Sequence, residues 1–219
     1  DRNVYYSSYL STYVERDVRE LSSNIDALKF HRFVTAVAAR TSQLLNYKAI
    51  ADDADIDMPT AKAWMNILET LGIIFLLHPY SNNVLKRTIK TPKVYFYDTG
   101  LVCYLTKWSS PEVAESGAMS GALLENFAVS EIMKSYQNAG LEPYLYFYRD
   151  RDAKEIDVIM EGDGKLCPLE IKKTTTPDKR LTRVFGVMDK SPLQLGTSAV
   201  LCMAERFSAF DRENLIVPI

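Results

Sequence analysis

The 219-residue sequence predicts a mixed α/β protein of the α+β type, built from two parts. Three observations predict this class. Apolar residues recur at helical spacing through most of the first half, whereas short runs in the second half alternate between apolar and polar residues. Clusters of Gly, Asp and Asn separate these runs and indicate turns. With 47% apolar and 25% charged residues, the composition is that of an ordinary globular chain.

The first half is predicted to be helical as far as Gly72. Trp64, Ile67 and Leu68 lie at helical spacing in the last of these helices. Gly72 closes that helix, because glycine readily adopts the left-handed conformation that ends a helix. The helices are expected over residues 8–22, 28–45, 47–51 and 60–71.

A short helix, a turn over residues 55–59 and a longer helix have the shape of a helix-turn-helix. Two apolar strands follow, over residues 73–77 and 94–97, joined through Asn82 and Asn83. This order predicts a winged-helix domain. The predicted domain spans residues 27–110, preceded by a linker helix within residues 1–26.

The winged helix lacks the charge pattern of a domain that reads DNA sequence, because aspartates before the would-be recognition helix would repel phosphates. These are Asp52, Asp53, Asp55 and Asp57. Basic residues gather instead between the two wing strands, where we expect contact with the phosphate backbone of nucleic acid rather than with bases. They are Lys86, Arg87, Lys90 and Lys93.

The second half predicts one helix, three strands, a further helix and a strand, the αβββαβ core of the restriction-endonuclease-like fold. The expected turn over residues 161–164 makes the second and third strands an antiparallel hairpin. This domain is predicted over residues 111–219. Its elements are expected over residues 120–139, 144–150, 154–160, 165–172, 178–190 and 197–203.

Ionisable residues are concentrated on the two strands of this hairpin. Because side chains alternate along a strand, Glu155 and Asp157 should share one face, with Ile156 and Val158 on the other. Glu170 and Lys172 should likewise share a face, and Asp157 then lies opposite or diagonal to Glu170, depending on the register. Alternating charged and apolar residues are also typical of any half-exposed strand.

Carboxylates converging in this way suit Mg²⁺ or Mn²⁺, with coordination positions left for water and a phosphate oxygen. Asp157 and Glu170 would hold the metal, and Lys172 would orient the attacking water. The sequence therefore predicts divalent-metal-dependent phosphodiester hydrolysis by these three catalytic residues. Arg149 begins a small basic patch beside the site, which is equally consistent with a solvated charged face.

Four further motifs resemble a known family. They are residues 9–18 (YLSTYVERDV), 95–101 (YFYDTGL), 121–127 (GALLENF) and 147–149 (FYR). Together with the two strand motifs, they resemble the C-terminal part of prokaryotic AAA-superfamily ATPases, whose C-terminal domain of unknown function belongs to the PD-(D/E)xK nuclease-like superfamily. The resemblance implies that Glu125 is a further metal ligand beside Asp157 and Glu170. The Pro-Asp of the superfamily name is absent, since Ile156 precedes Asp157.

The resemblance also implies an ATPase domain in cis, ahead of this chain. The chain contains no G-x-x-x-x-G-K-[ST], so ATP binding by a P-loop is expected only in that missing domain. The implied partner is nucleic acid, with DNA favoured over RNA, or a protein. Two functions remain open: a nuclease, or a catalytically inactive binding module that regulates the ATPase. The acidic recognition region disfavours a stand-alone transcriptional regulator.

Composition disfavours several other classes of protein. Residues 111–219 carry 13 basic and 17 acidic residues, which suits a bound cation better than a strongly basic nucleic-acid surface. The three cysteines lack CxxC spacing, and the two histidines make a Ser-His-Asp hydrolase a poor candidate. The longest apolar run, residues 71–77, is too short to span a bilayer, and the start has no signal-peptide form. We therefore expect a cytoplasmic protein without membrane partners.

Overall fold

The computed structural model describes residues 1–14, 16, 25–80 and 89–219. The first half of the chain is mostly helical. Its elements are α1 (Arg2–Tyr9), the π-helical turn η1 (Leu10–Val14), α3 (Ala27–Ala38), β1 (Gln43–Leu44), α4 (Tyr47–Ala54), α5 (Met58–Thr70), β2 (Ile74–Pro79), β3 (Lys93–Phe96), α6 (Thr99–Leu105) and α7 (Pro111–Ser116).

The second half holds most of the strands, and the mixed α/β class predicted from sequence is confirmed. Its elements are α8 (Ser120–Asn138), β4 (Leu145–Arg149), β5 (Glu155–Gly162), β6 (Lys165–Lys172), the 3-10 helix η2 (Lys179–Lys190), β7 (Gln194–Leu195), β8 (Ser198–Cys202), β9 (Ser208–Ala209) and β10 (Asn214–Pro218).

Several helices of the first half, among them α3, α4 and α5, begin at residues whose side chains accept hydrogen bonds from the first turn. Asp26 caps α3, Asn46 caps α4 and Asp57 caps α5. Such side chains satisfy amide groups that have no partner inside the helix. Asp57, which the sequence suggested only as a charge that repels phosphates, therefore also stabilises the start of α5.

Several predicted boundaries were wrong. The first helix begins at Arg2 rather than at residue 8, because Asp1 caps it. The helix expected over residues 28–45 ends at Ala38, since Gln43 and Leu44 pair with β3. Helices α6 and α7 and strand β10 were not predicted. Residues 15 and 17–22 of the first predicted helix, and the Asn82-Asn83 turn, lie outside the described residues.

The described strands form a ten-stranded mixed sheet in the order β1-β3-β2-β4-β5-β6-β8-β10-β9, with β7 attached to β6. Strands β1, β3 and β2 are antiparallel neighbours. In the second half, β4, β5 and β6 are antiparallel, whereas β8 runs parallel to β6 and β10 parallel to β8. The two halves join where His78 and Pro79 pair in parallel with Tyr146 and Phe147.

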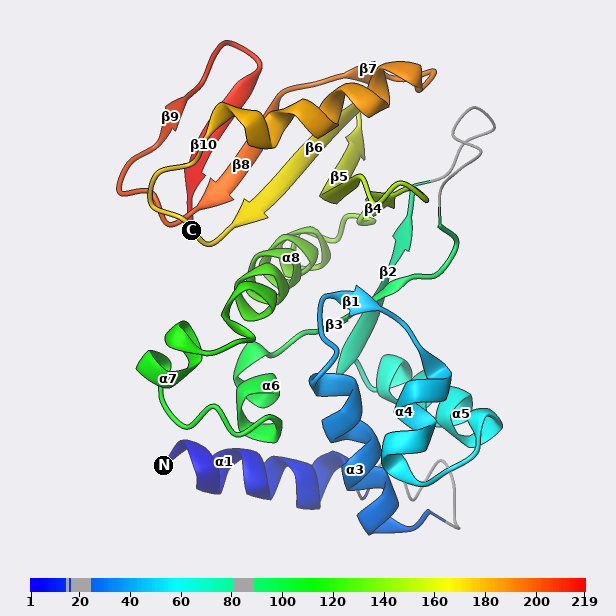
Figure 1. Cartoon of the computed structure of the whole chain (residues 1–219). Coiled ribbons are helices and arrows are strands. Elements are labelled where there is room, and N and C mark those ends of the chain that lie inside the picture. Colours follow the sequence, from blue (N-terminus) through cyan, green and yellow to red (C-terminus); the bar gives the residue numbers. More distant parts are fainter. Residues whose placement is uncertain (15, 17–24, 81–88) are drawn as a thin grey trace.

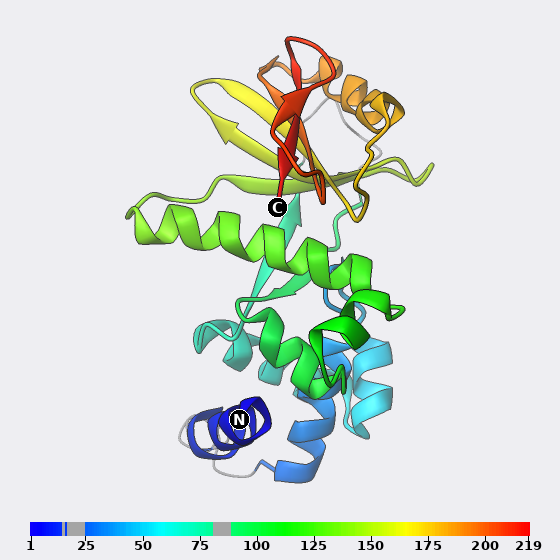
Figure 2. The same cartoon turned by 90° about the vertical axis from the view of Figure 1, so that its left-hand side faces the viewer.

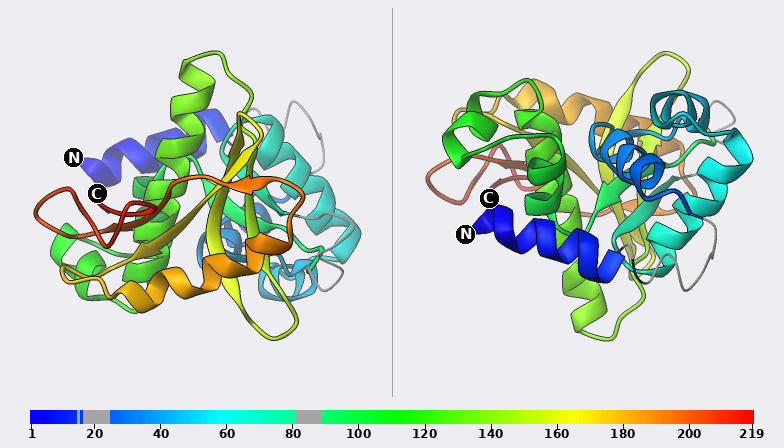
Figure 3. Two further views of the ribbon diagram at one scale, coloured as in Figure 1. Left: turned by 90° about the horizontal axis from the view of Figure 1, so that it is seen from above. Right: turned by 90° about the horizontal axis from the view of Figure 1, so that it is seen from below.

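Helix α8 lies between the helices of the first half and the larger part of the sheet (Figures 1 and 2). The two views of Figure 3 show α8 and η2 on opposite sides of the strands. The core beneath α8 takes residues from both halves, including Phe75 and Tyr95 from the first and Val158 and Leu169 from the second. A separate core beneath η2 contains Ile156 and Phe185. Among the described residues, no helix is long and apolar enough to cross a membrane.

Asn126 of α8 connects the helix to the first half. Its Oδ1 accepts hydrogen bonds from the Phe96 amide, at 2.8 Å, and from the Thr41 hydroxyl, at 2.6 Å. Its Nδ2 donates to the Phe96 carbonyl at 3.1 Å and to the Thr99 hydroxyl at 2.9 Å. The side chain is fully buried, so this network satisfies polar groups that water does not reach.

We predict that Asn126→Ala lowers the free energy of unfolding by about 2–4 kcal/mol, because it leaves buried donors without an acceptor. Urea denaturation measures the change. Gln137→Ala on the same helix is the control: it removes one exposed hydrogen bond, to the Tyr97 hydroxyl, and should cost less than about 0.5 kcal/mol. Equal losses in the two variants would contradict the structural role of Asn126.

Candidate functional site

Asp157 lies at an irregularity of the sheet. The pairing of β4 with β5 shifts register between Tyr146 and Tyr148, which produces a bulge in β5. A bulge breaks the alternation of side chains and re-aims the residues beside it. Ile156 consequently packs in the core beneath η2 and Val158 in the core beneath α8. The prediction that Ile156 and Val158 share a face was therefore wrong.

The pairing of β5 with β6 places Asp157 relative to Glu170. The pairing of the two strands ends with Val158 and Leu169, and Asp157 and Glu170 are the next residues along β5 and β6. The Asp157 carboxylate turns toward the backbone of β6, where Oδ2 accepts a hydrogen bond of 2.8 Å from the Ile171 amide. A carboxylate held by a backbone amide has little rotational freedom, so this contact fixes Asp157 at the sheet surface.

Lys93 of β3 supplies a buried positive charge to this region. Its Nζ lies 2.6 Å from Glu155 Oε1 and 2.9 Å from Glu125 Oε1. The same atom lies 4.0 Å from Asp157 Oδ1 and 5.5 Å from the centre of the Phe147 ring. Only 3% of the Lys93 side chain is exposed. Three carboxylates from α8 and β5 therefore surround one ammonium group that comes from the first half of the chain.

Each of these carboxylates also has a second donor. The Tyr95 hydroxyl donates to Glu125 Oε1 at 2.6 Å, and Arg149 Nη1 donates to Glu155 Oε2 at 3.0 Å. The Ile171 amide holds Asp157, as described above. Buried ionic groups are stable only when their remaining hydrogen-bonding capacity is satisfied, and this arrangement meets that requirement. We call Lys93, Glu125, Glu155 and Asp157 the carboxylate cluster.

The charges of the cluster act strongly on its titratable groups. Burial on its own lowers the pKa of Lys93, but Glu125, Asp157 and Glu155 together raise it above its ordinary value. The ammonium is therefore charged at neutral pH. Burial, followed by the neighbouring charge of Glu125, raises the pKa of Asp157 and of the Tyr95 hydroxyl well above their usual ranges.

Glu170 and Lys172 approach the cluster from another direction. Leu169 and Ile171 pack beneath α8, so the alternation along β6 directs Glu170 and Lys172 to the other face of the sheet. Glu170 is nevertheless close enough for its charge to interact with Glu125. Burial raises the pKa of Glu170 to about 7, with Lys172 opposing and Glu125 adding to the rise.

The predicted metal ligands can be tested against this geometry. Carboxylate oxygens are suitable donors for a hard divalent cation. Glu125 and Asp157 do meet, but they meet around the Lys93 ammonium, and Glu155 rather than Glu170 completes the group. The predicted set of Glu125, Asp157 and Glu170 therefore does not fit a metal in this arrangement, because a cation would have to replace the Lys93 Nζ.

The basic residues predicted to bind nucleic acid lie in different environments. Lys86 and Arg87 lie outside the described residues. Lys90 is exposed, and Arg149 is half-buried in its ion pair with Glu155. The prediction that Lys93 contacts a phosphate backbone was wrong, because Lys93 is buried against the carboxylates. The pattern of β3 contains the signal for this, since Lys93 shares a strand face with Tyr95 in an otherwise apolar run.

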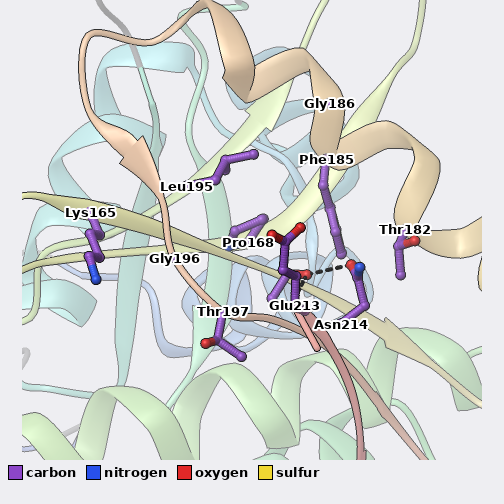
Figure 4. A pocket seen from close by; sticks show the side chains of 11 residues that line it. Lys165, Pro168, Thr182, Phe185, Gly186, Leu195, Gly196, Thr197, Glu213 and Asn214 are labelled. Atoms are coloured by element: carbon purple, nitrogen blue, oxygen red, sulfur yellow. Dashed lines mark hydrogen bonds between the residues drawn. The ribbon is translucent and has the colours of Figure 1, made fainter. Parts of the chain in front are cut away.

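A hollow of about 420 Å³ lies on the η2 side of the sheet (Figure 4). Phe185 and Gly186 of η2 line it, together with Gly196 before β8 and Glu213 before β10. A Cβ on Gly196 would lie 2.6 Å from Cys167 Sγ, so the close packing here excludes a side chain. None of the predicted catalytic, metal-binding or nucleic-acid-binding residues lines this hollow.

Comparison with known proteins places the chain in a family. Residues 1–112, just over half of the chain, match the family described as a domain of unknown function, DUF8612. The chain belongs to the DUF8612 family. Residues 120–219 match a second domain of unknown function, DUF4143. The DUF4143 domain is often found in AAA-ATPase-associated proteins.

Two curated relatives match almost the whole chain. They are the uncharacterized proteins Mb2031c of Mycobacterium bovis and Rv2008c of Mycobacterium tuberculosis. Each is 29% identical over 213 residues, which is 96% of this chain and 46% of the relative. The chain thus spans about half the length of the curated relatives that it matches.

We predict that Glu170 makes the fold less stable as the pH rises. Since its folded pKa of about 7 exceeds the ordinary value of 4.5, the folded chain binds a proton that the unfolded chain releases between these values. The contribution of Glu170 to the free energy of unfolding is therefore greatest below pH 4.5. It falls by on the order of 3 kcal/mol in total by the time the pH has passed 7. Glu170→Gln, which stays neutral, should reduce this slope in urea denaturation from pH 5 to 8.

The control for this prediction is Glu205→Gln, which removes an exposed carboxylate on the chain after β8. It should leave the pH dependence of stability unchanged. If Glu170→Gln keeps the full pH dependence of the wild type, the pKa of Glu170 is not raised in the folded protein.

Proposed function

We propose that this chain is the C-terminal regulatory region of an AAA-type ATPase, and that it binds nucleic acid without hydrolysing it. The observation that carries the proposal is the Lys93 ammonium at the centre of the carboxylate cluster. Hydrolysis of the predicted kind requires a divalent metal on these carboxylates. An ammonium in that place offsets part of their charge but brings neither a coordinated water nor a Lewis acid to a phosphate.

The element order supports the fold assignments on which the proposal depends. Between residues 27 and 96 the chain forms helix, strand, two helices and two strands, with β1, β3 and β2 antiparallel, as in a winged helix. From α8 to β8 it forms a helix, three strands, the 3-10 helix η2 and strand β8, with the short strand β7 before β8, which resembles the αβββαβ order of a nuclease-like domain. The DUF4143 match supports the link to an ATPase, and we place the protein in the cytoplasm with it.

The pairing of the two halves supports nucleic-acid binding at one end of the central strands. The Ile89 amide donates to the Arg149 carbonyl at 2.9 Å, which brings the chain before β3 beside the β4–β5 turn. Two basic stretches that are far apart in sequence become neighbours through this contact. Lys90 on one side, and Arg151 and Lys154 on the other, are exposed. Exposed cations on adjoining segments favour contact with a phosphate backbone.

A second candidate function is metal-dependent hydrolysis by the same domain. The placement of Asp157 and Glu170 next to the pair Val158 and Leu169 favours it, since acidic side chains on neighbouring strands are what that chemistry uses. The two functions differ in the fate of a bound nucleic acid. A single experiment on labelled single- and double-stranded DNA can therefore measure binding and cleavage together.

We predict that the chain binds these DNAs with a salt-dependent affinity and leaves them intact in Mg²⁺ or Mn²⁺. The double charge reversal Lys90→Glu, Arg151→Glu should weaken binding and reduce the slope of log K against log salt by about one for each lost phosphate contact. Fluorescence anisotropy measures binding, and gel electrophoresis of the same samples measures cleavage.

Lys165→Glu is the matched control, because it reverses an exposed charge at the far end of the β5–β6 hairpin. It should leave DNA affinity near the wild-type value. Loss of binding in both variants would argue against a localised basic surface at this end of the strands. Metal-dependent cleavage by the wild type that disappears in Asp157→Asn would overturn the proposal and establish the hydrolase.

A further inference from the structure

We propose that Glu125, Glu155 and Asp157 form a cation site that the chain fills with its own Lys93 ammonium, and that removing this ammonium turns the cluster into a divalent-cation site. This inference rests on the proposed function in one respect, namely that the site is closed to metal in the wild type. It concerns a ligand set that differs from the predicted one, since Glu155 takes the place of Glu170.

The first argument is charge. Three carboxylates lie within 4.0 Å of one Nζ atom, so the ammonium alone cannot neutralise them. Arg149 engages the second oxygen of Glu155, and the Ile171 amide and Tyr95 hydroxyl contribute only dipoles. With the ammonium removed, a buried and strongly negative cluster would remain. Such a cluster either takes up protons or binds a cation.

The second argument is that Lys93 is held in place by backbone pairing. Lys93 pairs with Leu77 of β2 on one side and with Leu44 of β1 on the other. The side chain of Lys93 therefore reaches the cluster from a strand that is fixed on both sides. A dissolved cation must compete with a charge that is already present at high effective concentration. This accounts for a site that is closed to metal although its donors suit one.

The third argument is geometric. The two shortest contacts of Nζ, 2.6 and 2.9 Å, exceed the roughly 2.0–2.1 Å of a magnesium–oxygen bond and approach the roughly 2.3–2.6 Å of a calcium–oxygen bond. Glu155 and Glu125 would need to move by less than about 1 Å to hold a metal at this point. Asp157 Oδ1 lies 4.0 Å from the Lys93 Nζ. It would bind the same metal either directly, after a rotation of its side chain, or through a bridging water.

The test replaces Lys93 by methionine, which keeps an unbranched chain of similar length and removes the charge. Mn²⁺ and Ca²⁺ are titrated separately into the full chain, with calorimetry for affinity and thermal unfolding for Tm. We expect Lys93→Met to bind at least one of these ions with a Kd more than about tenfold below that of the wild type. The same ion should raise the Tm of the variant and leave that of the wild type nearly unchanged.

Two further variants test whether metal binding depends on the loss of the Lys93 charge and on the Asp157 carboxylate. Lys93→Arg keeps the positive charge and should bind neither ion more tightly than the wild type. Lys93→Met combined with Asp157→Asn removes one oxygen ligand and should lose the affinity that Lys93→Met gained. A folded Lys93→Met variant that binds no more Mn²⁺ or Ca²⁺ than the wild type overturns the inference, as does gained binding that survives Asp157→Asn unchanged.

Lys93→Met is also informative if it does not fold in the absence of metal. The variant is then refolded from urea with and without Mn²⁺ or Ca²⁺, and circular dichroism follows the recovery of a cooperative transition. Recovery only with the divalent ion supports the inference, and failure with both ions overturns it. The two failures can be told apart, because these outcomes concern metal binding by Lys93→Met, whereas the proposed function fails if the wild type cleaves DNA.

Discussion

The ion pairs of Lys93 are the interaction on which the rest of the structure depends. A charged group removed from water is costly unless partners compensate it, and Lys93 has Glu125 and Glu155 within 2.9 Å. Because Lys93 belongs to β3 and its partners to α8 and β5, these pairs form only when the two halves are assembled. The electrostatics therefore favour one relative placement of β3, α8 and β5. Apolar contacts alone would define that placement less sharply.

The surrounding packing holds the same three elements together. Asn126 attaches α8 to the end of β3, and Phe75 and Tyr95 pack with Val158 and Leu169 in a single core. The pairing of β2 with β4 makes the sheet continuous through both halves. A boundary between residues 112 and 120 thus divides the chain by sequence families, whereas the core and the carboxylate cluster cross it.

Much of the fold was predictable because local patterns specify it. The hairpin over residues 161–164 and the helix before β4 follow from turn residues and periodicity, which act over a few positions. The pattern of β3 indicates that Lys93 is buried, but its partners were not predictable in this way, since they lie 32 and 62 positions away in sequence. The bulge at Asp157 arises from the pairing with β4, and no property of β5 alone indicates it. The convergence of Glu125 and Asp157 was correctly expected, but the cation between them was not.

The central claim is that a charged Lys93 ammonium lies among these carboxylates in the folded protein. Nitrogen-15 NMR of the lysine side chains tests it most directly, since a buried and hydrogen-bonded ammonium exchanges its protons with water far more slowly than an exposed one. The account predicts one slowly exchanging ammonium signal at neutral pH that is absent from Lys93→Arg and shifts in Glu125→Gln. A wild-type spectrum in which every lysine ammonium exchanges as fast as an exposed one would contradict it.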